Sequence, residues 1–181
     1  MQWTMTTLVA TLRHALCALP DARKGGNNQR YTMGDAALGA FSVFFMQSPS
    51  FLDFQVRMQK ARGRNNASSL FGIAQIPSMQ QIRNLLDPVS PAQVAPLFMA
   101  LVAPIVADGG LTSHRVLDGR LLVARDGTEH HASAAIHCPV CATRTLANGK
   151  TQYYHTAVTP VIVAPGQATV LPLAPEFVVP Q

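Results

Sequence analysis

The sequence predicts an α+β protein, with helices in residues 1–110 and a β-sheet in residues 111–181. Apolar residues recur at helical spacing in the first part, whereas from residue 115 onward β-branched and aromatic runs alternate with Asp-Gly, Asn-Gly and Pro-Gly turns. The chain has 181 residues, 48% of them hydrophobic, which is enough for one domain or two small ones. We therefore expect a helical domain followed by a sheet-containing domain.

Caps and helix breakers place the helices of the first domain. The first apolar helix ends before Pro20, and the polar loop after it contains consecutive glycines and asparagines. Pro91 suits the first turn of a longer helix, which Gly109 and Gly110 end. Between these limits, the side chains that can cap the start of a helix are Thr32, Ser50 and Ser78. The pattern thus places five helices before residue 110.

Extended runs between turn signals place the strands of the second domain. These runs are residues 116–117, 121–124, 153–163 and 169–173. Segments 151–164 and 168–173 would pair as a hairpin across the turn at 165–167. Because a sheet of so few strands leaves one face uncovered, we expect further chain or another molecule to supply a second layer.

Basic residues are concentrated in the first half of the chain. Residues 1–90 contain nine lysines and arginines against four aspartates, whereas residues 91–181 contain five charged residues of each sign. Four of the basic residues fall within eight positions: Arg57, Lys60, Arg62 and Arg64. This basic cluster is typical of a surface that contacts phosphate groups, and a solvated helix end is the alternative interpretation.

The sequence indicates a cytoplasmic protein. Three cysteines do not make a disulfide framework, and Cys17, in an apolar helical segment, is expected to be a buried thiol. The N-terminus lacks the basic region of a signal peptide, and Arg13 and His14 interrupt its apolar run. The sequence contains no run of eighteen apolar residues, so we expect no membrane-spanning helix.

Asp126 is a candidate metal ligand. It follows the apolar run 121–124 and precedes Gly127, so we expect it to leave a buried strand beside a surface crevice, where its oxygens could bind a divalent cation. Asp-Gly is also a favoured hairpin turn, and the same dipeptide occurs at Asp118-Gly119. Spacing alone leaves both interpretations of Asp126 open.

Cys138 and Cys141 predict half of a tetrahedral zinc site. They enclose a Pro-Val pair, and such a knuckle directs backbone amides at its sulfurs. Histidines must supply the other two ligands: His137 and His155 are the first candidates, and His130 or His131 the alternatives. A tight Asn-Gly turn after the knuckle would bring the strand that carries His155 back over it. A reduced thiol pair and a redox motif are the competing interpretations.

The order of these motifs resembles that of bacterial insertion-sequence transposases of the DDE class. Three stretches carry the resemblance: LLVARDGTE at residues 121–129, IHCPVC at 136–141 and NGKTQYYH at 148–155. The similarity extends upstream through residues 70–86 and into residues 21–28, so it covers most of the chain. Each motif is short, and their order and spacing together are fairly specific.

The resemblance implies the N-terminal part of a transposase. A helical, DNA-binding domain at 1–110 would precede, at 111–181, the first strands of an RNase H-like mixed sheet. In that family a strand ending in Asp-Gly-Thr carries the first acidic residue of the catalytic core, which corresponds to Asp126 here. The implied activity is DNA cleavage and strand transfer with two Mg²⁺ ions. The Cys/His segment at 130–155 would be a zinc-stiffened insert between the first two core strands.

The implied partner is double-stranded DNA at the terminal repeats of the element. The residues that would contact its phosphates are the basic cluster of Arg57, Lys60, Arg62 and Arg64. The setting would be the bacterial cytoplasm, at the nucleoid. The protein could assemble there as a homodimer.

The resemblance also implies that this chain is inactive alone. The family uses a second Asp and a Glu, and after Asp126 the sequence contains only the acids Glu129 and Glu176, neither placed like those partners. One carboxylate cannot hold two metal ions. The alternative function is therefore a non-catalytic DNA-binding protein, a regulator or remnant of the transposase. A small zinc-stabilised module without a DNA role is a third.

Overall fold

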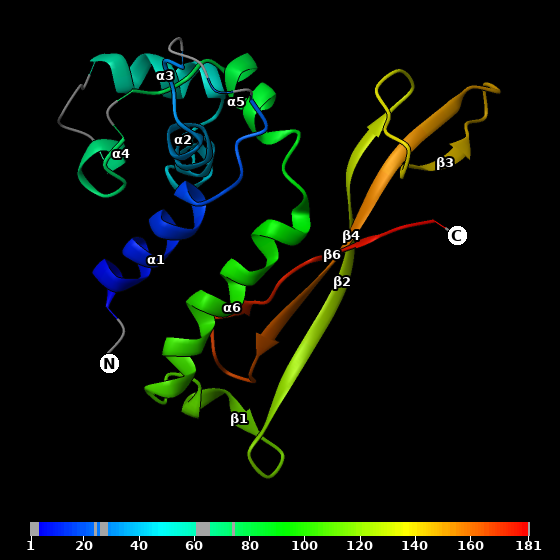
Figure 1. Ribbon diagram of the computed structural model, residues 1–181. Coiled ribbons are helices and arrows are strands. Elements are labelled where there is room, and N and C mark those ends of the chain that lie inside the picture. Colours follow the sequence, from blue (N-terminus) through cyan, green and yellow to red (C-terminus); the bar gives the residue numbers. More distant parts are fainter. Residues whose placement is uncertain (1–3, 24, 26–28, 61–65, 74, 181) are drawn as a thin grey trace. The chain divides into compact units, whose positions relative to one another are not determined.

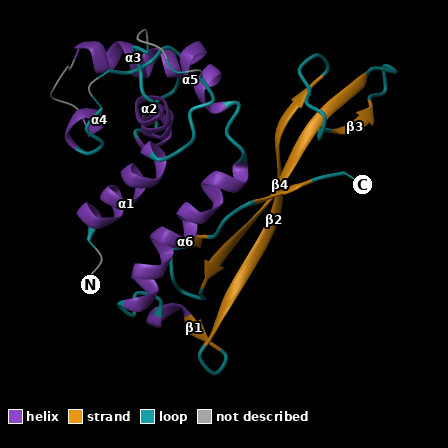
Figure 2. Ribbon diagram, viewed as in Figure 1, coloured by secondary structure: helices purple, strands orange, loops and turns teal. Residues whose placement is uncertain are grey.

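The computed structural model describes residues 4–23, 25, 29–60, 66–73 and 75–180 (Figure 1). Within these residues the chain forms six α-helices and an antiparallel sheet of six strands, so the predicted α+β class is confirmed (Figure 2). The chain divides into a helical unit, Met1–Leu101, and a sheet unit, Val102–Gln181. The division therefore falls inside the last helix rather than after it.

The helical unit is built from α1 to α5 and the first part of α6. Their bounds are Met5–Cys17 (α1), Met33–Phe45 (α2), Phe51–Lys60 (α3), Asn66–Ser69 (α4), Met79–Leu86 (α5) and Pro91–Ala107 (α6). Five of these correspond to the predicted helices. The exception is α4, because four residues are too few to show a helical period in the sequence.

Side-chain caps start the helices where the sequence predicts them. The Asp35 backbone N–H donates to the Thr32 hydroxyl (3.1 Å), and the Thr32 N–H donates to the Asp35 carboxylate (2.8 Å), which completes a capping box at α2. Ser78 starts α5 with the same arrangement, and Ser50 Oγ accepts a hydrogen bond from the first turn of α3. These bonds satisfy backbone donors that a helix start leaves unpaired, so local sequence fixes each starting point.

Helix α2 is the centre of the helical core. Its buried residues are Met33, Gly34, Ala36, Ala37, Leu38, Gly39, Ser42 and Val43. It packs against α1 and α5, and Figure 1 shows it end-on between the other helices of the unit. Small residues permit this close approach: a Cβ atom on Gly34 would lie 2.6 Å from the Cys17 Sγ.

Cys17 does not occupy the buried position predicted for it. It is the last residue of α1, and it is exposed. The buried residues of α1 are Leu12 and Leu16, so Cys17 lies one position beyond the apolar stripe that faces the core. The prediction of a buried thiol is therefore wrong, because apolar neighbours in the sequence do not all share one helix face.

The sheet unit contains one short 3-10 helix, η1, and six strands. Their bounds are Thr112–His114 (η1), Arg115–Val116 (β1), Arg120–Ser133 (β2), Ala142–Thr145 (β3), Thr151–Val163 (β4), Leu171–Pro172 (β5) and Glu176–Val178 (β6). Strands β2 and β4 pair along most of their length, from Leu122 opposite Val163 to Ser133 opposite Tyr153. Strand β1 pairs with β2, and β3, β5 and β6 pair with β4. Every pair among the described strands is antiparallel, so the expected mixed sheet is not seen there.

Strand β2 is much longer than the apolar run that predicts it. The run ends at Ala124, whereas the strand continues to Ser133. Its second half is polar and exposed, so backbone hydrogen bonds to β4 hold it in place rather than burial of side chains. The register shifts between Glu129 and His131, as at a β-bulge.

Two predicted turns are confirmed. Leu117, Asp118 and Gly119 have φ angles of 45°, 63° and 84°, and they reverse the chain between β1 and β2. The second turn, at 165–167, joins β4 to β5 and brings Leu171 opposite Ile162. The hairpin formed by β4 and β5 is shorter than predicted, because β5 contains only Leu171–Pro172.

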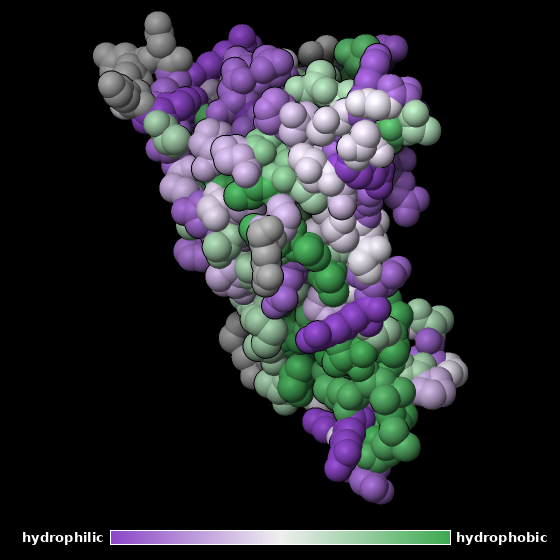
Figure 3. Space-filling model, turned by 90° about the vertical axis from the view of Figure 1, so that its right-hand side faces the viewer, coloured by the Kyte–Doolittle hydropathy of each residue, from purple (hydrophilic) through white to green (hydrophobic). Residues whose placement is uncertain are grey.

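The sheet unit has a small core and many exposed apolar side chains. The core residues are Leu111, Ile162 and Leu171. The exposed apolar side chains of its strands and turns are Leu117, Val123, Ile136, Val140, Val170, Phe177, Val178 and Val179. Figure 3 shows hydrophobic side chains gathered over the lower half of the face that it presents. Such exposure is typical of a surface that a further layer covers.

Replacing Thr32 with alanine should lower the free energy of unfolding by about 1 kcal/mol, because the Asp35 N–H loses its acceptor. Thr32→Ser keeps a hydroxyl at this position and should stay within about 0.5 kcal/mol of the wild type. Urea unfolding followed by helical circular dichroism measures both values. An alanine variant as stable as the wild type would show that this cap does not stabilise α2.

Candidate metal centre

A tight turn immediately before β3 brings two cysteine sulfurs together. The Cys138 backbone N–H donates to the Cys141 Sγ (3.1 Å), and the Cys141 N–H donates to the Cys138 carbonyl oxygen (3.2 Å). The two Sγ atoms lie 3.5 Å apart. A backbone amide therefore points at a sulfur, which is the arrangement that favours the thiolate form needed to bind a metal.

Strand β4 places a histidine ring against the two sulfurs. The His155 Nε2 lies 3.2 Å from the Sγ of Cys138 and 3.2 Å from the Sγ of Cys141. The three ligand atoms all lie within 4.8 Å of one another, and the three residues are half-buried. Cys138, Cys141 and His155, which we call the Cys₂His group, could thus hold a metal ion. It is the only such cluster of three or more in the described part of the chain.

The donor atoms of the Cys₂His group decide which metals suit it. Thiolate sulfur and imidazole nitrogen are ligands for transition metals, whereas Mg²⁺ and Ca²⁺ prefer oxygen. The group is therefore unsuited to the two-magnesium chemistry that the resemblance implies, and any magnesium would need a separate site.

The register of β3 and β4 explains why His155 faces the knuckle. Side chains alternate along a strand, so His155 shares its face of β4 with Tyr153, which pairs with Thr143. Cys141 is two residues before Thr143 and falls on the same side. Antiparallel pairing thus joins ligands that are 14 residues apart in the sequence.

His137, predicted as a ligand, has other contacts. Its ring stacks on Tyr153 with centroids 4.2 Å apart, and its Nδ1 lies 3.3 Å from the Ala135 carbonyl oxygen. It is not a member of the Cys₂His group, although it precedes Cys138 directly. The stacking contact holds the ring beside the group rather than in it.

The two alternative histidines lie on β2. His131 is opposite His155 in the β2–β4 register, so both side chains project from the same face of the sheet. The His131 Nε2 lies 3.4 Å from the Ile136 carbonyl oxygen, in the segment that leads into the knuckle. His130 is exposed and lies at the register shift. The structure therefore places His131, and not His130, directly opposite His155 of the Cys₂His group on the neighbouring strand.

An ion pair that sequence reasoning missed lies on the opposite face. The Arg144 guanidinium donates two hydrogen bonds, each of 2.9 Å, to the two oxygens of Glu129. It also lies 4.9 Å from the centroid of the Tyr154 ring. This pair links β2 to β3 across β4 and engages the carboxylate of Glu129. No sequence signal could have identified it, because the pairing depends on strand register.

Asp126 lies in the middle of β2, opposite Thr159 on β4. Its side chain is exposed, so the prediction that it leaves the end of a buried strand is wrong. The competing prediction of an Asp126-Gly127 turn is wrong too, because both residues continue the strand. Among the described residues no group of three His, Cys, Asp or Glu ligands forms around Asp126. The magnesium prediction therefore has no support from this geometry.

The basic cluster is described only in part. The Arg57 Nε lies 2.7 Å from the Asp53 carboxylate, one helical turn earlier on α3. Lys60 is exposed at the end of that helix, where positive charge also complements the helix dipole. Arg62 and Arg64 lie outside the described residues.

Known proteins do not identify the function of this site. No protein family matches the chain, and neither curated proteins nor solved structures match it. Within the described residues no single helix is long and apolar enough to cross a membrane, and α5 and α6 meet that test only as a bent pair. Function is therefore inferred from the residues of the chain itself.

The substitution Asp126→Asn should leave the free energy of unfolding within about 0.5 kcal/mol of the wild type, because the exposed carboxylate pairs with no described side chain. Urea unfolding of the two proteins tests this expectation. A loss of more than about 1 kcal/mol would mean that Asp126 has a structural role.

Proposed function

We propose that the Cys₂His group binds one zinc ion, which closes the segment between β2 and β3 onto β4. Zinc binds sulfur at about 2.3 Å and imidazole nitrogen at about 2.0–2.1 Å, and a triangle of ligand atoms with sides of 3.5, 3.2 and 3.2 Å is small enough for one ion to reach all three. These distances are the observation that supports zinc. They leave one tetrahedral position for a fourth ligand.

A structural role for the zinc follows from how this segment is packed. The side chains of Ile136, before the knuckle, and of Val140, between its two cysteines, are 70% and 51% exposed. The segment therefore has no hydrophobic core of its own to fix it. A metal ion bound by both ends of a short hairpin supplies the folding free energy that such a core would give.

His137 and His131 are the two candidates for the fourth zinc ligand. His137 would have to leave its stack on Tyr153, and His131 would have to leave the Ile136 carbonyl oxygen. Both movements are side-chain rotations of residues that border the group. A water molecule in the fourth position is the remaining arrangement.

We further propose that the chain is the N-terminal part of a DDE transposase that binds duplex DNA through its helical unit. The observation that carries this proposal is the ordered set of motifs: Asp126 on a strand, the cysteine knuckle, and His155 on the next long strand of the same sheet. In this proposal β2 and β4 are the first strands of an RNase H-like core. Asp126 is the first Mg²⁺ carboxylate, and its co-ligands come from polypeptide other than the described residues.

The alternative function, a non-catalytic DNA-binding regulator, is favoured by the setting of Asp126. No group of three or more His, Cys, Asp or Glu ligands forms around it among the described residues, and the Glu129 carboxylate is engaged by Arg144. Both functions require the helical unit to bind DNA, so a DNA-binding measurement tests what they share.

The wild-type protein should contain one zinc ion per chain, as measured by native mass spectrometry of protein purified without chelator. The variant Cys138→Ser/Cys141→Ser should be metal-free, because it loses two of the three ligands. Cys17→Ser is the matched control and should keep its zinc, since Cys17 is exposed in the helical unit. Metal-free, folded wild-type protein would rule out the zinc proposal. Of His137→Ala and His131→Ala, the variant that weakens zinc binding identifies the fourth ligand.

The variant R57Q/K60Q/R62Q/R64Q should bind duplex DNA about tenfold or more weakly at low salt, because it removes charges that attract phosphate. Its plot of log affinity against log salt concentration should be less steep, by about 0.9 for each lost phosphate contact. Fluorescence anisotropy with a labelled duplex measures both quantities.

The matched control for charge is R115Q/R120Q/R125Q/K150Q, which removes four exposed basic residues of the sheet unit. It should retain most of the affinity and the salt dependence of the wild type. Equal losses in both variants would mean that only net charge matters, and unchanged binding in the cluster variant would contradict the proposed DNA-binding surface.

A further inference from the structure

Helix α5 presents a polar face of unusual composition. Ile82 and Leu85 are each 5% exposed and anchor the helix in the core of the helical unit. The exposed face carries Gln80, Gln81, Arg83 and Asn84. A solvated helix face usually carries lysine and glutamate, whereas this one holds three amides and one guanidinium and no carboxylate.

These side chains are the ones that recognise base edges in duplex DNA. Asparagine and glutamine can form paired hydrogen bonds with adenine, and arginine with guanine. The Gln80 side-chain amide donates to the Asn84 side-chain oxygen Oδ1 (2.9 Å), one helical turn away, so the two amides are already ordered with respect to each other. An α-helix with its side chains is roughly 10–12 Å across, which fits the roughly 12 Å width of the major groove.

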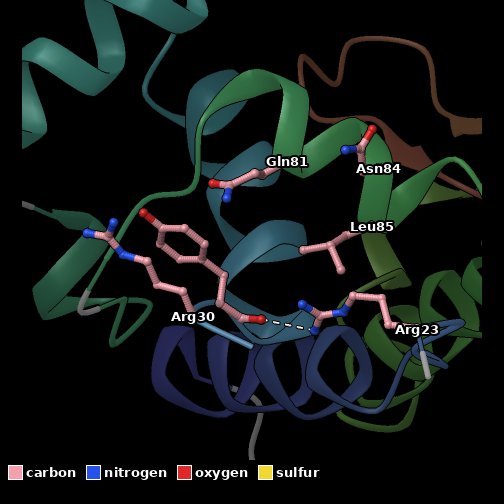
Figure 4. Close-up of a pocket in the computed structure, with 6 residues that line it drawn as sticks. Arg23, Arg30, Gln81, Asn84 and Leu85 are labelled. Carbon is pink, nitrogen blue, oxygen red and sulfur yellow. Dashed lines mark hydrogen bonds between the residues drawn. The ribbon is translucent and has the colours of Figure 1, made fainter. Parts of the chain in front are cut away.

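A pocket of about 350 Å³ adjoins this face and contains two arginines (Figure 4). Figure 4 shows Gln81, Asn84 and Leu85 on the α5 side of the pocket, and Arg23 and Arg30 on the other. Basic groups beside an amide-bearing helix are placed to contact the phosphates that flank the bases being read.

The two arginines differ in how firmly they are held. The Arg23 guanidinium donates to the Asp21 carboxylate and to the Tyr31 carbonyl oxygen (3.0 Å). Side-chain and backbone hydrogen bonds from Arg23 lower the pKa of the Asp21 carboxyl to about 2, so this pair is ionised at neutral pH. Arg30 is exposed and lies 5.3 Å from the centroid of the Tyr31 ring, with no carboxylate partner in the described residues. Arg30 is therefore the arginine available for a phosphate.

We propose that the exposed face of α5 reads base edges in the major groove of duplex DNA, through Gln80, Arg83 and Asn84, while Arg30 contacts a neighbouring phosphate. This inference rests on the proposed function, since it assumes that the helical unit binds DNA. It adds which surface supplies sequence specificity, whereas the basic cluster supplies affinity for any sequence.

The test is selection from a pool of duplexes with randomised bases, at fixed salt, using the full chain. The wild type should enrich a defined sequence. Q80A/N84A should lower the ratio of specific to random-sequence affinity about tenfold or more, with an unchanged salt slope, because amides contact bases and not phosphates. Both alanines favour helix, and Gln81 stays in place to cap α5, so the variant should fold.

Two further variants separate the possible outcomes. R30Q should reduce the salt slope by about 0.9 and leave the enriched sequence unchanged. Q167A, which removes an exposed amide from the sheet unit, should behave as the wild type. If Q80A/N84A enriches the same sequence with the same ratio, or if the wild type binds duplexes without enriching any, the base-reading role of α5 is wrong. If the wild type binds no duplex at low salt, the proposed function itself fails.

Discussion

The antiparallel pairing of β2 and β4 is the constraint on which the sheet unit depends. Its register fixes which side chains share a face over eleven paired positions, from Leu122 opposite Val163 to Ser133 opposite Tyr153. One face then carries His131 and His155, and the other carries Glu129 with its partner Arg144. A slip of β2 by one residue would move His131 off the face that carries His155 and would separate Glu129 from Arg144. The position of His131, the ion pair of Glu129 and the place of Asp126 in mid-strand thus follow from the β2–β4 ladder, whereas the contact of His155 with the two cysteines follows from the β3–β4 pairing.

The two ends of this ladder are stabilised by different means. Near β1 and β5, the apolar residues Leu111, Ile162 and Leu171 are buried and form a small core. At the far end the side chains of β2 are polar and mostly exposed, and Ile136 and Val140 are exposed as well. Hydrophobic burial therefore decreases along the hairpin. A metal ion held by Cys138, Cys141 and His155 would stabilise the end of the hairpin that has few buried apolar side chains. The ion pair of Glu129 with Arg144 contributes at this end as well, although partly exposed ion pairs stabilise little.

The helical and sheet units differ in the chemistry that they offer to a partner. The helical unit contains the excess positive charge, with Arg57 and Lys60 at the end of α3, and the amides and Arg83 of α5. The sheet unit contains the thiols and imidazole of the Cys₂His group and the exposed carboxylate of Asp126. Basic and amide groups suit recognition of a polyanion, whereas soft ligands suit a metal with a structural role. The proposed division into a DNA-binding part and the start of a catalytic core follows this chemical difference.

The sequence by itself determined five of the helices, the turns at Asp118-Gly119 and 165–167, and the cysteine knuckle, because each is specified by neighbouring residues. Thr32, Ser50 and Ser78 start helices through hydrogen bonds to residues three positions on, and Asp118 turns the chain locally. Cys138 and Cys141 are close in sequence, so their proximity in space was also predictable.

Only the tertiary structure decided which side chains meet across strands. Strand β2 continues past Asp126 because its backbone forms hydrogen bonds with β4, and these bonds do not depend on whether the side chains are polar or apolar. The tertiary structure placed His155 against both sulfurs and His137 on Tyr153, a choice that spacing left open. It also paired Glu129 with Arg144. Strand register sets all of these contacts, and register depends on the whole hairpin rather than on any local pattern of residues.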